Sequence, residues 1–173
     1  FIAWLIDMSY KNKKFFYKNT VSQPARQTIS TAYTEITGSK VQVFPSKSSP
    51  TIYYKFCYYY STIYDFATGS TGAYDKPFLH LKLQSSTDNF TTNIVDIVGT
   101  EHNVSGDTVQ NRDYYYRTQT AFFLLEDFTS KYIRLVARAY STSNEVDLHR
   151  ARQFDGNDSL EVTFDPTLIV MEL

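Results

Sequence analysis

The chain has few of the residues on which metal centres, nucleophilic enzymes and disulfide-stabilised domains depend. Its 173 residues include one cysteine, three histidines, one tryptophan and two methionines. A single cysteine, Cys57, excludes an internal disulfide framework and a cysteine-based zinc site. Because Cys57 lies in the middle of a strand-like pattern, we expect a packed, small apolar residue there rather than a reactive thiol.

Long apolar runs are also missing. The longest run, FIAWLI at residues 1–6, is far shorter than the roughly 20 residues that a membrane-spanning helix needs. It also lacks the basic flank and the small-residue cleavage site of a signal peptide. We therefore expect no membrane association. The chain begins at Phe1 without a methionine, and we interpret it as part of a longer or processed polypeptide.

No constellation of residues indicates catalysis. His80, His102 and His149 have no second histidine at ligand spacing, so we expect solvated or hydrogen-bonded surface histidines. The segment DGNDS (155–159) lacks the full twelve-residue calcium pattern, which favours a hairpin turn. The glycines of residues 67–77 lack the strand–glycine–helix context of a phosphate-binding loop. The sequence predicts a protein that is not an enzyme and uses no metal or cofactor.

Tyrosine and phenylalanine are abundant, at 15 and 13 residues, and both favour β-structure. No segment longer than ten residues has apolar positions at helical spacing, whereas about eight to ten short strands alternate with turns. We predict an all-β fold, an antiparallel β-sandwich, with a jelly roll as the first choice and an immunoglobulin-like sandwich as the alternative. We assign residues 28–173 to this β domain and residues 1–27 to an irregular N-terminal arm and linker.

One predicted strand has aromatic residues on both of its faces. The segment PTIYYKFCYYYST (50–62) places Tyr54, Phe56 and Tyr58 on one face and Tyr53 and Tyr59 on the other. A strand of a simple sandwich has one buried and one solvated face, and several exposed rings promote aggregation. We therefore expect the second face to be buried against identical subunits, in an obligate oligomer. By contrast, FLHLKLQSS (78–86) alternates regularly, with its leucines inward.

Arginine and tyrosine share the outward face of the segment YIRLVARAYS (132–141). This composition is typical of protein–protein contact surfaces. The alternative is that the arginines stack on aromatic rings of their own subunit. The segment DYYYR (113–117) repeats the aromatic pattern. The candidate interface residues are Tyr53, Tyr59, Tyr114, Tyr116, Tyr132, Arg134, Arg138 and Tyr140.

The charge is distributed unevenly along the chain. Residues 1–60 hold eight Lys and Arg against two acids, and the remaining residues hold nine against sixteen. A basic arm suits docking on an acidic neighbour, including another copy of the chain, although chance variation explains the numbers equally well. The arm could also stack on single-stranded nucleic acid, but the overall pI near 6.3 and the lack of an RNA-binding signature disfavour this. The candidate anchoring residues are Lys11, Lys13, Lys14, Phe15, Phe16 and Tyr17.

Several segments resemble a family of virion proteins. YIRLVARAYSTSNEVDLHRARQFDG (132–156) and FDPTLIVMEL (164–173) resemble the last strands of jelly-roll proteins in virions, especially marine bacteriophage fibre and capsid-associated proteins. SSPTIYYKFCYYYS (48–61) and KPFLHLKL (76–83) resemble the earlier strands of the same family. The resemblance covers roughly residues 28–173 and implies a TNF-like or C1q-like jelly roll that assembles as a trimer on a virus particle. Phe154 stands where family members tend to have tryptophan.

These observations lead to two functional hypotheses. The first is a non-enzymatic structural protein of the virion, in a capsid decoration, spike or tail fibre, which binds itself and other virion proteins. The alternative is a receptor- or carbohydrate-binding head whose loops, Ala67–Pro77 and Glu101–Asp113, stack on a host surface glycan. A hydrolase on a β-sandwich is disfavoured because paired acids and histidines are scarce.

Overall fold

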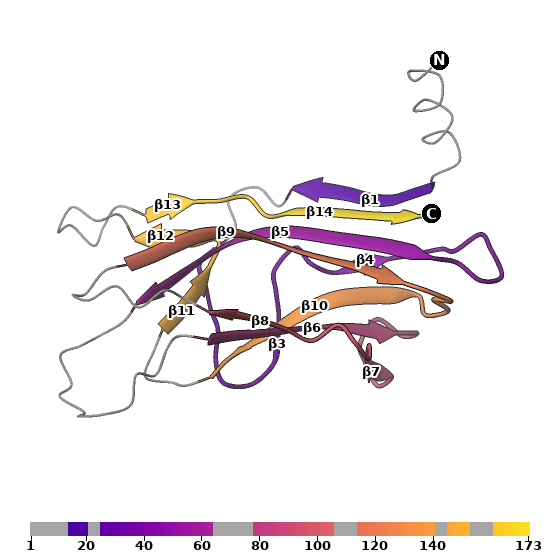
Figure 1. Cartoon of the computed structure of the whole chain (residues 1–173), viewed down its shortest axis with the longest axis horizontal. Helices are drawn as coiled ribbons and strands as arrows, with labels where there is room; N and C mark the ends of the chain where they lie inside the picture. Colours follow the sequence, from indigo (N-terminus) through magenta and orange to yellow (C-terminus); the bar gives the residue numbers. More distant parts are fainter. Residues whose placement is uncertain (1–13, 21–24, 64–77, 106–113, 141–144, 153–160) are drawn as a thin grey trace, which may run out of the picture.

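A computed structural model describes residues 14–20, 25–63, 78–105, 114–140, 145–152 and 161–173. Within these ranges the chain forms fourteen strands and no helix, and every strand pair is antiparallel. Two sheets stack as the layers of a β-sandwich (Figure 1). The predicted all-β sandwich is therefore confirmed. The described part of the chain has no helix that could cross a membrane.

The strands are divided between two large sheets and a short third one. Sheet A, the upper layer in Figure 1, contains β1 (Lys14–Thr20), β14 (Thr167–Glu172), β5 (Ile52–Ile63), β11 (Glu145–Leu148), β2 (Gln27–Thr28) and β9 (Tyr114–Leu125). Sheet B contains β3 (Thr34–Glu35), β4 (Val41–Gln42), β10 (Tyr132–Ala139), β6 (Phe78–Ser86), β7 (Ile94–Asp96) and β8 (His102–Ser105). The third sheet pairs β12 (Arg150–Arg152) with β13 (Glu161–Thr163).

The long strand β5 organises sheet A. One of its edges pairs with β9 along all twelve residues, and the other edge pairs first with β14 and then with β11. The β-branched and aromatic side chains of β5 suit a pleated surface on which neighbours pack from both sides. Strand β5 therefore lies in the interior of its sheet, whereas β9 lies at an edge of it.

The hydrophobic core lies between the two sheets. Tyr54, Phe56 and Tyr58 of β5 are fully buried there, opposite the leucines of β6 and the alternate residues of β10. Burial of each such side chain contributes roughly 1.5–3 kcal/mol. The Tyr54 hydroxyl donates a hydrogen bond of 2.6 Å to the carbonyl oxygen of Ser39, and burial raises the pKa of Tyr54 well above its ordinary value. The predicted inward face of residues 78–86 is confirmed, since Leu79, Leu81 and Leu83 are all buried.

The structure differs from the sequence-based strand assignment in three places. The weakly alternating sequence TISTAYTEI (28–36) predicts one strand, but this region contains two short strands, β2 and β3, which belong to different sheets. Part of the predicted polar loop at residues 101–113 is β8, which pairs with β6. Residues 14–20, assigned to an irregular arm, form β1, which pairs with β14 at the edge of sheet A. The sequences of such short segments show no strong alternation of apolar and polar residues. Their strand conformation depends on pairing with a neighbouring strand that is distant in the sequence.

Candidate interaction surface

The residues of β5 that point away from sheet B form a row of mixed apolar and polar side chains. The strand register places Tyr53 between Met171 of β14 and Leu124 of β9. In the same way, Lys55 lies between Ile169 and Phe122, and Cys57 lies between Thr167 and Thr120. We call the five large apolar residues of this face the outer patch: Tyr53, Phe122, Leu124, Ile169 and Met171.

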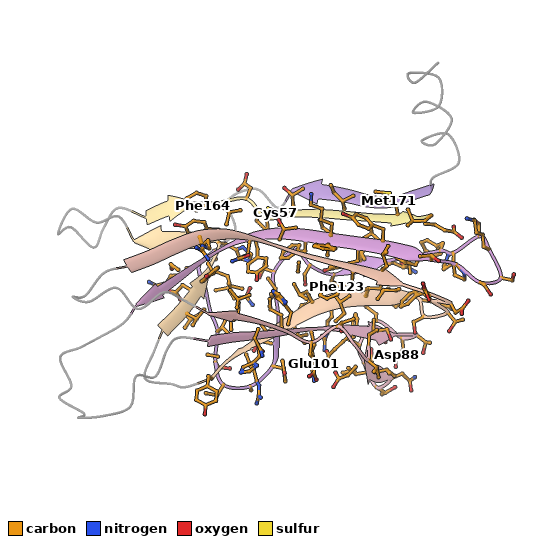
Figure 2. All side chains as sticks on the ribbon, viewed as in Figure 1. Cys57, Asp88, Glu101, Phe123, Phe164 and Met171 are labelled. Atoms are coloured by element: carbon orange, nitrogen blue, oxygen red, sulfur yellow. The ribbon has the colours of Figure 1, made fainter. Side chains whose placement is uncertain are left out.

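The outer patch is accessible to solvent in the single chain. Phe122 is 68% exposed and Leu124 is 60% exposed, and the other three residues of the patch are half-buried. Figure 2 shows Met171 on sheet A and Phe123, the inward neighbour of Phe122, between the two layers. A contiguous exposed apolar surface on a folded domain indicates a contact site. Tyr53, a candidate interface residue, is half-buried within the outer patch.

Tyr59, the other aromatic residue predicted for this face, is covered by its own chain. Its ring is buried and stacks on the ring of Phe164, with a centroid separation of 3.7 Å and an interplanar angle of 12°. Phe164 directly follows β13, which with β12 lies above the left-hand end of sheet A in Figure 1. The expectation that identical subunits cover this ring is wrong for Tyr59, because the segment before β14 covers it within the subunit.

The backbone of His149 forms hydrogen bonds with both Tyr59 and Phe164. Its N–H donates to the carbonyl oxygen of Tyr59 at 2.9 Å, and its carbonyl oxygen accepts from the N–H of Phe164 at 2.8 Å. A positive φ of 70° at His149 turns the chain from β11 into β12. This turn moves the chain from sheet A into the small third sheet.

The side chain of His149 is buried, so the prediction of a surface histidine is wrong for it. Neither Nδ1 nor Nε2 has a hydrogen-bond partner among the described residues. Burial lowers the pKa of His149 to about 4, because desolvation disfavours the charged imidazolium. The sequence DLHR (147–150) does not indicate this burial, since charged residues lie close to His149 on both sides. By contrast, His102 is exposed, and His80 lies half-buried beside Tyr140.

Arg134 and Arg138 contact side chains of their own subunit on the outer face of sheet B. Arg134 donates from Nε and Nη2 to Oε1 of Gln84 at 3.0 and 2.8 Å, and its guanidinium lies 4.1 Å from the ring centroid of Phe90. Arg138 and Lys82 both lie over the ring of Tyr33. These contacts match the alternative considered for the arginines, in which they stack on rings of the same subunit.

Arg134 also takes part in an ion pair, so its charge has a partner within the chain. Its Nη1 lies 3.3 Å from Oε2 of Glu35. On the same face, Nζ of Lys82 lies 2.5 Å from Oδ2 of Asp96. The outer face of sheet B is consequently charged and internally paired, whereas the outer face of sheet A holds the apolar residues of the outer patch around Lys55.

The remaining candidate residues are only partly described. Tyr132 is half-buried and meets Phe90 edge-on, with centroids 6.5 Å apart, and Tyr140 is 64% exposed. Tyr114 and Tyr116 lie in β9, and Lys14, Phe15, Phe16 and Tyr17 lie in β1, where the structure describes the backbone alone. Lys11 and Lys13, the DGNDS segment, the loop Ala67–Pro77 and residues 106–113 of the second loop lie outside the described residues.

The described residues do not form a metal site, and they include the single cysteine. Within those residues, no group of three or more His, Cys, Asp or Glu side chains could hold a metal ion. Cys57 is half-buried beside Thr167 and Thr120 on the outer face of sheet A. Cys57 is therefore a small side chain that packs between two neighbouring strands, as expected from its position in the strand pattern.

An open groove of about 650 Å³ borders the outer patch, and the sequence analysis did not identify it. Phe122 to Leu125 of β9 line one side, and the turn that follows β7 lines the other. Val98 in this turn is 96% exposed, and Val95 is also exposed. The signal available in the sequence was NIVDIV (93–98), which places apolar residues on both faces of a short strand.

No protein-family model matches the sequence, and no curated protein matches it. The resemblance to virion jelly-roll proteins therefore remains an interpretation of the quoted segments.

Proposed function

We propose that this chain is a non-enzymatic structural protein of a virus particle whose subunits assemble with one another through the outer patch. The observation that carries the proposal is the exposure of Phe122 and Leu124 beside Tyr53 on an otherwise well-packed sheet. A subunit that stays alone would leave this surface in water, which is unfavourable by about 25 cal/mol for each Å² of apolar area.

The contrast between the two outer faces supports this choice of surface. Sheet B carries ion pairs and cation–π contacts that satisfy its charges within the subunit. On sheet A, Lys55 is the charged side chain that lies among the residues of the outer patch. The cores of interfaces are depleted in charge and enriched in aromatic residues and methionine, so sheet A has the more suitable composition.

Residues 132–156 and 164–173 resemble the last strands of virion jelly-roll proteins. On this resemblance we propose a jelly-roll topology, a trimer and a location in a virion. Such a subunit serves as a capsid decoration, a spike or a fibre component, bound to its own copies and to other virion proteins. The alternative of a glycan-binding head depends on loops that lie largely outside the described residues.

The experiment is a comparison of two surfaces by multi-angle light scattering. Tyr53→Ser combined with Met171→Ser removes two neighbouring side chains of the outer patch, and Tyr140→Ser is the matched change on sheet B. We expect the double variant to shift towards 20.0 kDa, the mass of one chain, while Tyr140→Ser keeps the wild-type mass. Dissociation by Tyr140→Ser alone would instead place the contact on sheet B and overturn the proposal.

A further inference from the structure

The groove beside β9 has exposed apolar side chains on both of its walls. Phe122 and Leu124 of β9 lie on one wall, and Val95 of β7 and Val98 of the following turn lie on the other. Each of these four side chains is more than half exposed. A contiguous apolar surface of this kind indicates that another segment covers it.

The rim of the groove is acidic where β9 ends. Glu126 and Asp127 directly follow β9 and line the groove, and both side chains are exposed. Neither forms an ion pair with a side chain of the described residues. The groove therefore combines an apolar interior with a negatively charged rim. A complementary occupant has an apolar stretch close to basic residues.

The N-terminal segment of this chain has this composition. Residues 1–6, FIAWLI, form the longest apolar run of the sequence, and Lys11, Lys13 and Lys14 follow within eight residues, with Asp7 as the one acid between. Residues 1–13 lie outside the described residues. Transfer of such an apolar run from water into an apolar groove is favourable.

The strand register places the start of β1 at the same end of sheet A as the groove (Figure 1). Lys14 of β1 pairs with Glu172 of β14, which pairs with Ile52 of β5. Ile52 in turn pairs with Leu125 of β9, which lines the groove. Three strand spacings, about 15 Å, therefore separate Lys14 from Leu125. The seven residues before Lys14 can span about 23 Å when extended, so the apolar run can reach the groove of its own subunit.

We infer that residues 1–6 occupy this groove in their own subunit, with the lysines that follow them beside the acidic rim. The short distance favours the same chain over a second copy, because a short linker gives the attached segment a high effective concentration. The apolar contacts contribute most of the affinity. The ion pairs at the exposed rim orient the segment, since such pairs contribute little to stability.

The inference goes beyond the proposed function and does not depend on it. Phe122 and Leu124 belong both to the groove and to the outer patch. The other residues of the outer patch, Tyr53, Ile169 and Met171, do not line the groove. A segment docked in the groove therefore leaves these three residues available to a neighbouring subunit.

The single tryptophan of the chain, Trp4, lies within the apolar run and serves as the probe. We expect the fluorescence emission of Trp4 in the full-length protein to be blue-shifted and protected from acrylamide quenching. Val98→Asp places a charge in the groove, so it should shift the emission to the red and increase the quenching. Tyr140→Asp is the matched control, because Tyr140 is exposed on sheet B, and it should change neither value. Emission that Val98→Asp leaves unchanged would overturn the inference.

The oligomer mass separates this result from the test of the proposed function. Val98 lies outside the outer patch, so Val98→Asp should keep the wild-type mass in light scattering. Emission that is insensitive to Val98→Asp, in a protein whose wild type is oligomeric, would overturn the inference alone. Emission that depends on Val98, in a protein whose wild type is monomeric, would overturn the proposed function alone.

Chemical crosslinking distinguishes the two possible sources of the segment. Ala3→Cys combined with Val98→Cys, in a Cys57→Ala background, provides two thiols for a bismaleimide with a short flexible spacer. We expect the crosslinked product to keep the mass of one chain, 20.0 kDa, because both thiols belong to the same subunit. A product at twice this mass would show that the segment docks on a second copy, and it would overturn docking within the subunit.

Discussion

The ring of Tyr59 lies flat on the ring of Phe164, with their centroids 3.7 Å apart. This contact divides the outer face of β5 into two parts. Towards Ile63, the chain covers the face with its own segment before β14, and Tyr59 and Ser61 are both buried. Towards Ile52, the face remains open around Tyr53. The second aromatic face of the strand is thus buried by the subunit in one half and available to a neighbour in the other.

The two tyrosines of this face should respond differently to the same substitution. Tyr59→Ser removes a buried, stacked ring and should lower the free energy of unfolding by about 3–5 kcal/mol. Tyr53→Ser removes a half-buried ring and should lower it by about 1 kcal/mol. Urea denaturation of each variant, at a concentration that holds the association state fixed, measures both values. Equal losses would show that Phe164 does not protect Tyr59.

The buried His149 predicts a particular pH dependence of stability. Its folded pKa of about 4 lies below the ordinary value of 6.5, so the unfolded chain binds the extra proton first. The stabilising contribution is complete above pH 6.5 and is lost as the pH falls towards 4, with a total of about 3 kcal/mol. Denaturation at several pH values should show this loss.

A pair of variants isolates this contribution. His149→Asn removes the titrating group, and asparagine tolerates the positive φ at this position, so its stability should vary much less between pH 6.5 and 4. His102→Asn removes an exposed histidine and should retain the full dependence. If His149→Asn kept the wild-type pH profile, another group would be responsible.

The contacts of Arg134 predict a role within the subunit. Arg134→Lys keeps the positive charge but loses the paired hydrogen bonds to Gln84 and the stacking on Phe90. We expect it to lower the free energy of unfolding by about 1 kcal/mol and to leave the oligomer mass unchanged. Loss of the oligomer at unchanged stability would instead support the interface role that the sequence indicated for Arg134.

Glu172 should stabilise the loop after β4 through its carboxylate. Its Oε2 accepts hydrogen bonds from Ser46 N–H at 3.0 Å and from Ser46 Oγ at 2.7 Å, and its Oε1 accepts from Lys47 N–H at 3.0 Å. Glu172 is buried, so Glu172→Gln should lower the free energy of unfolding by about 2 kcal/mol. Glu101→Gln changes an exposed carboxylate and is the control, with an expected effect near zero. Similar effects of both variants would contradict this role.

Regular alternation was sufficient to predict the central strands of the sandwich. Leu79, Leu81 and Leu83 repeat with period two, and the aromatic residues of 52–60 mark β5 equally well. Short segments were harder, because β2 and β3 contain two residues each and their strand pairing depends on long-range neighbours. The covering of Tyr59 by Phe164 joins residues 105 positions apart, and the sequence pattern of neither segment encodes this contact.

The candidate surface was only partly predictable, because the exposure of its residues also depends on neighbours that are distant in the sequence. The sequence identified Tyr53 from the two-sided aromatic pattern, but the exposure of Phe122 depends on β9 lying at the edge of its sheet. Alternation shows which residues share a face but does not show which strand is at the edge. Arginine next to tyrosine indicated a contact surface, and the fold uses this pair of residue types within the subunit at Arg138 and Tyr33.

The central claim is that another copy of the chain covers the outer patch. Sedimentation equilibrium of the wild-type protein across the micromolar range tests it most directly. We predict a species whose mass is at least twice 20.0 kDa, and we expect this species to persist on dilution through the micromolar range. A single species of 20.0 kDa at every concentration would contradict it.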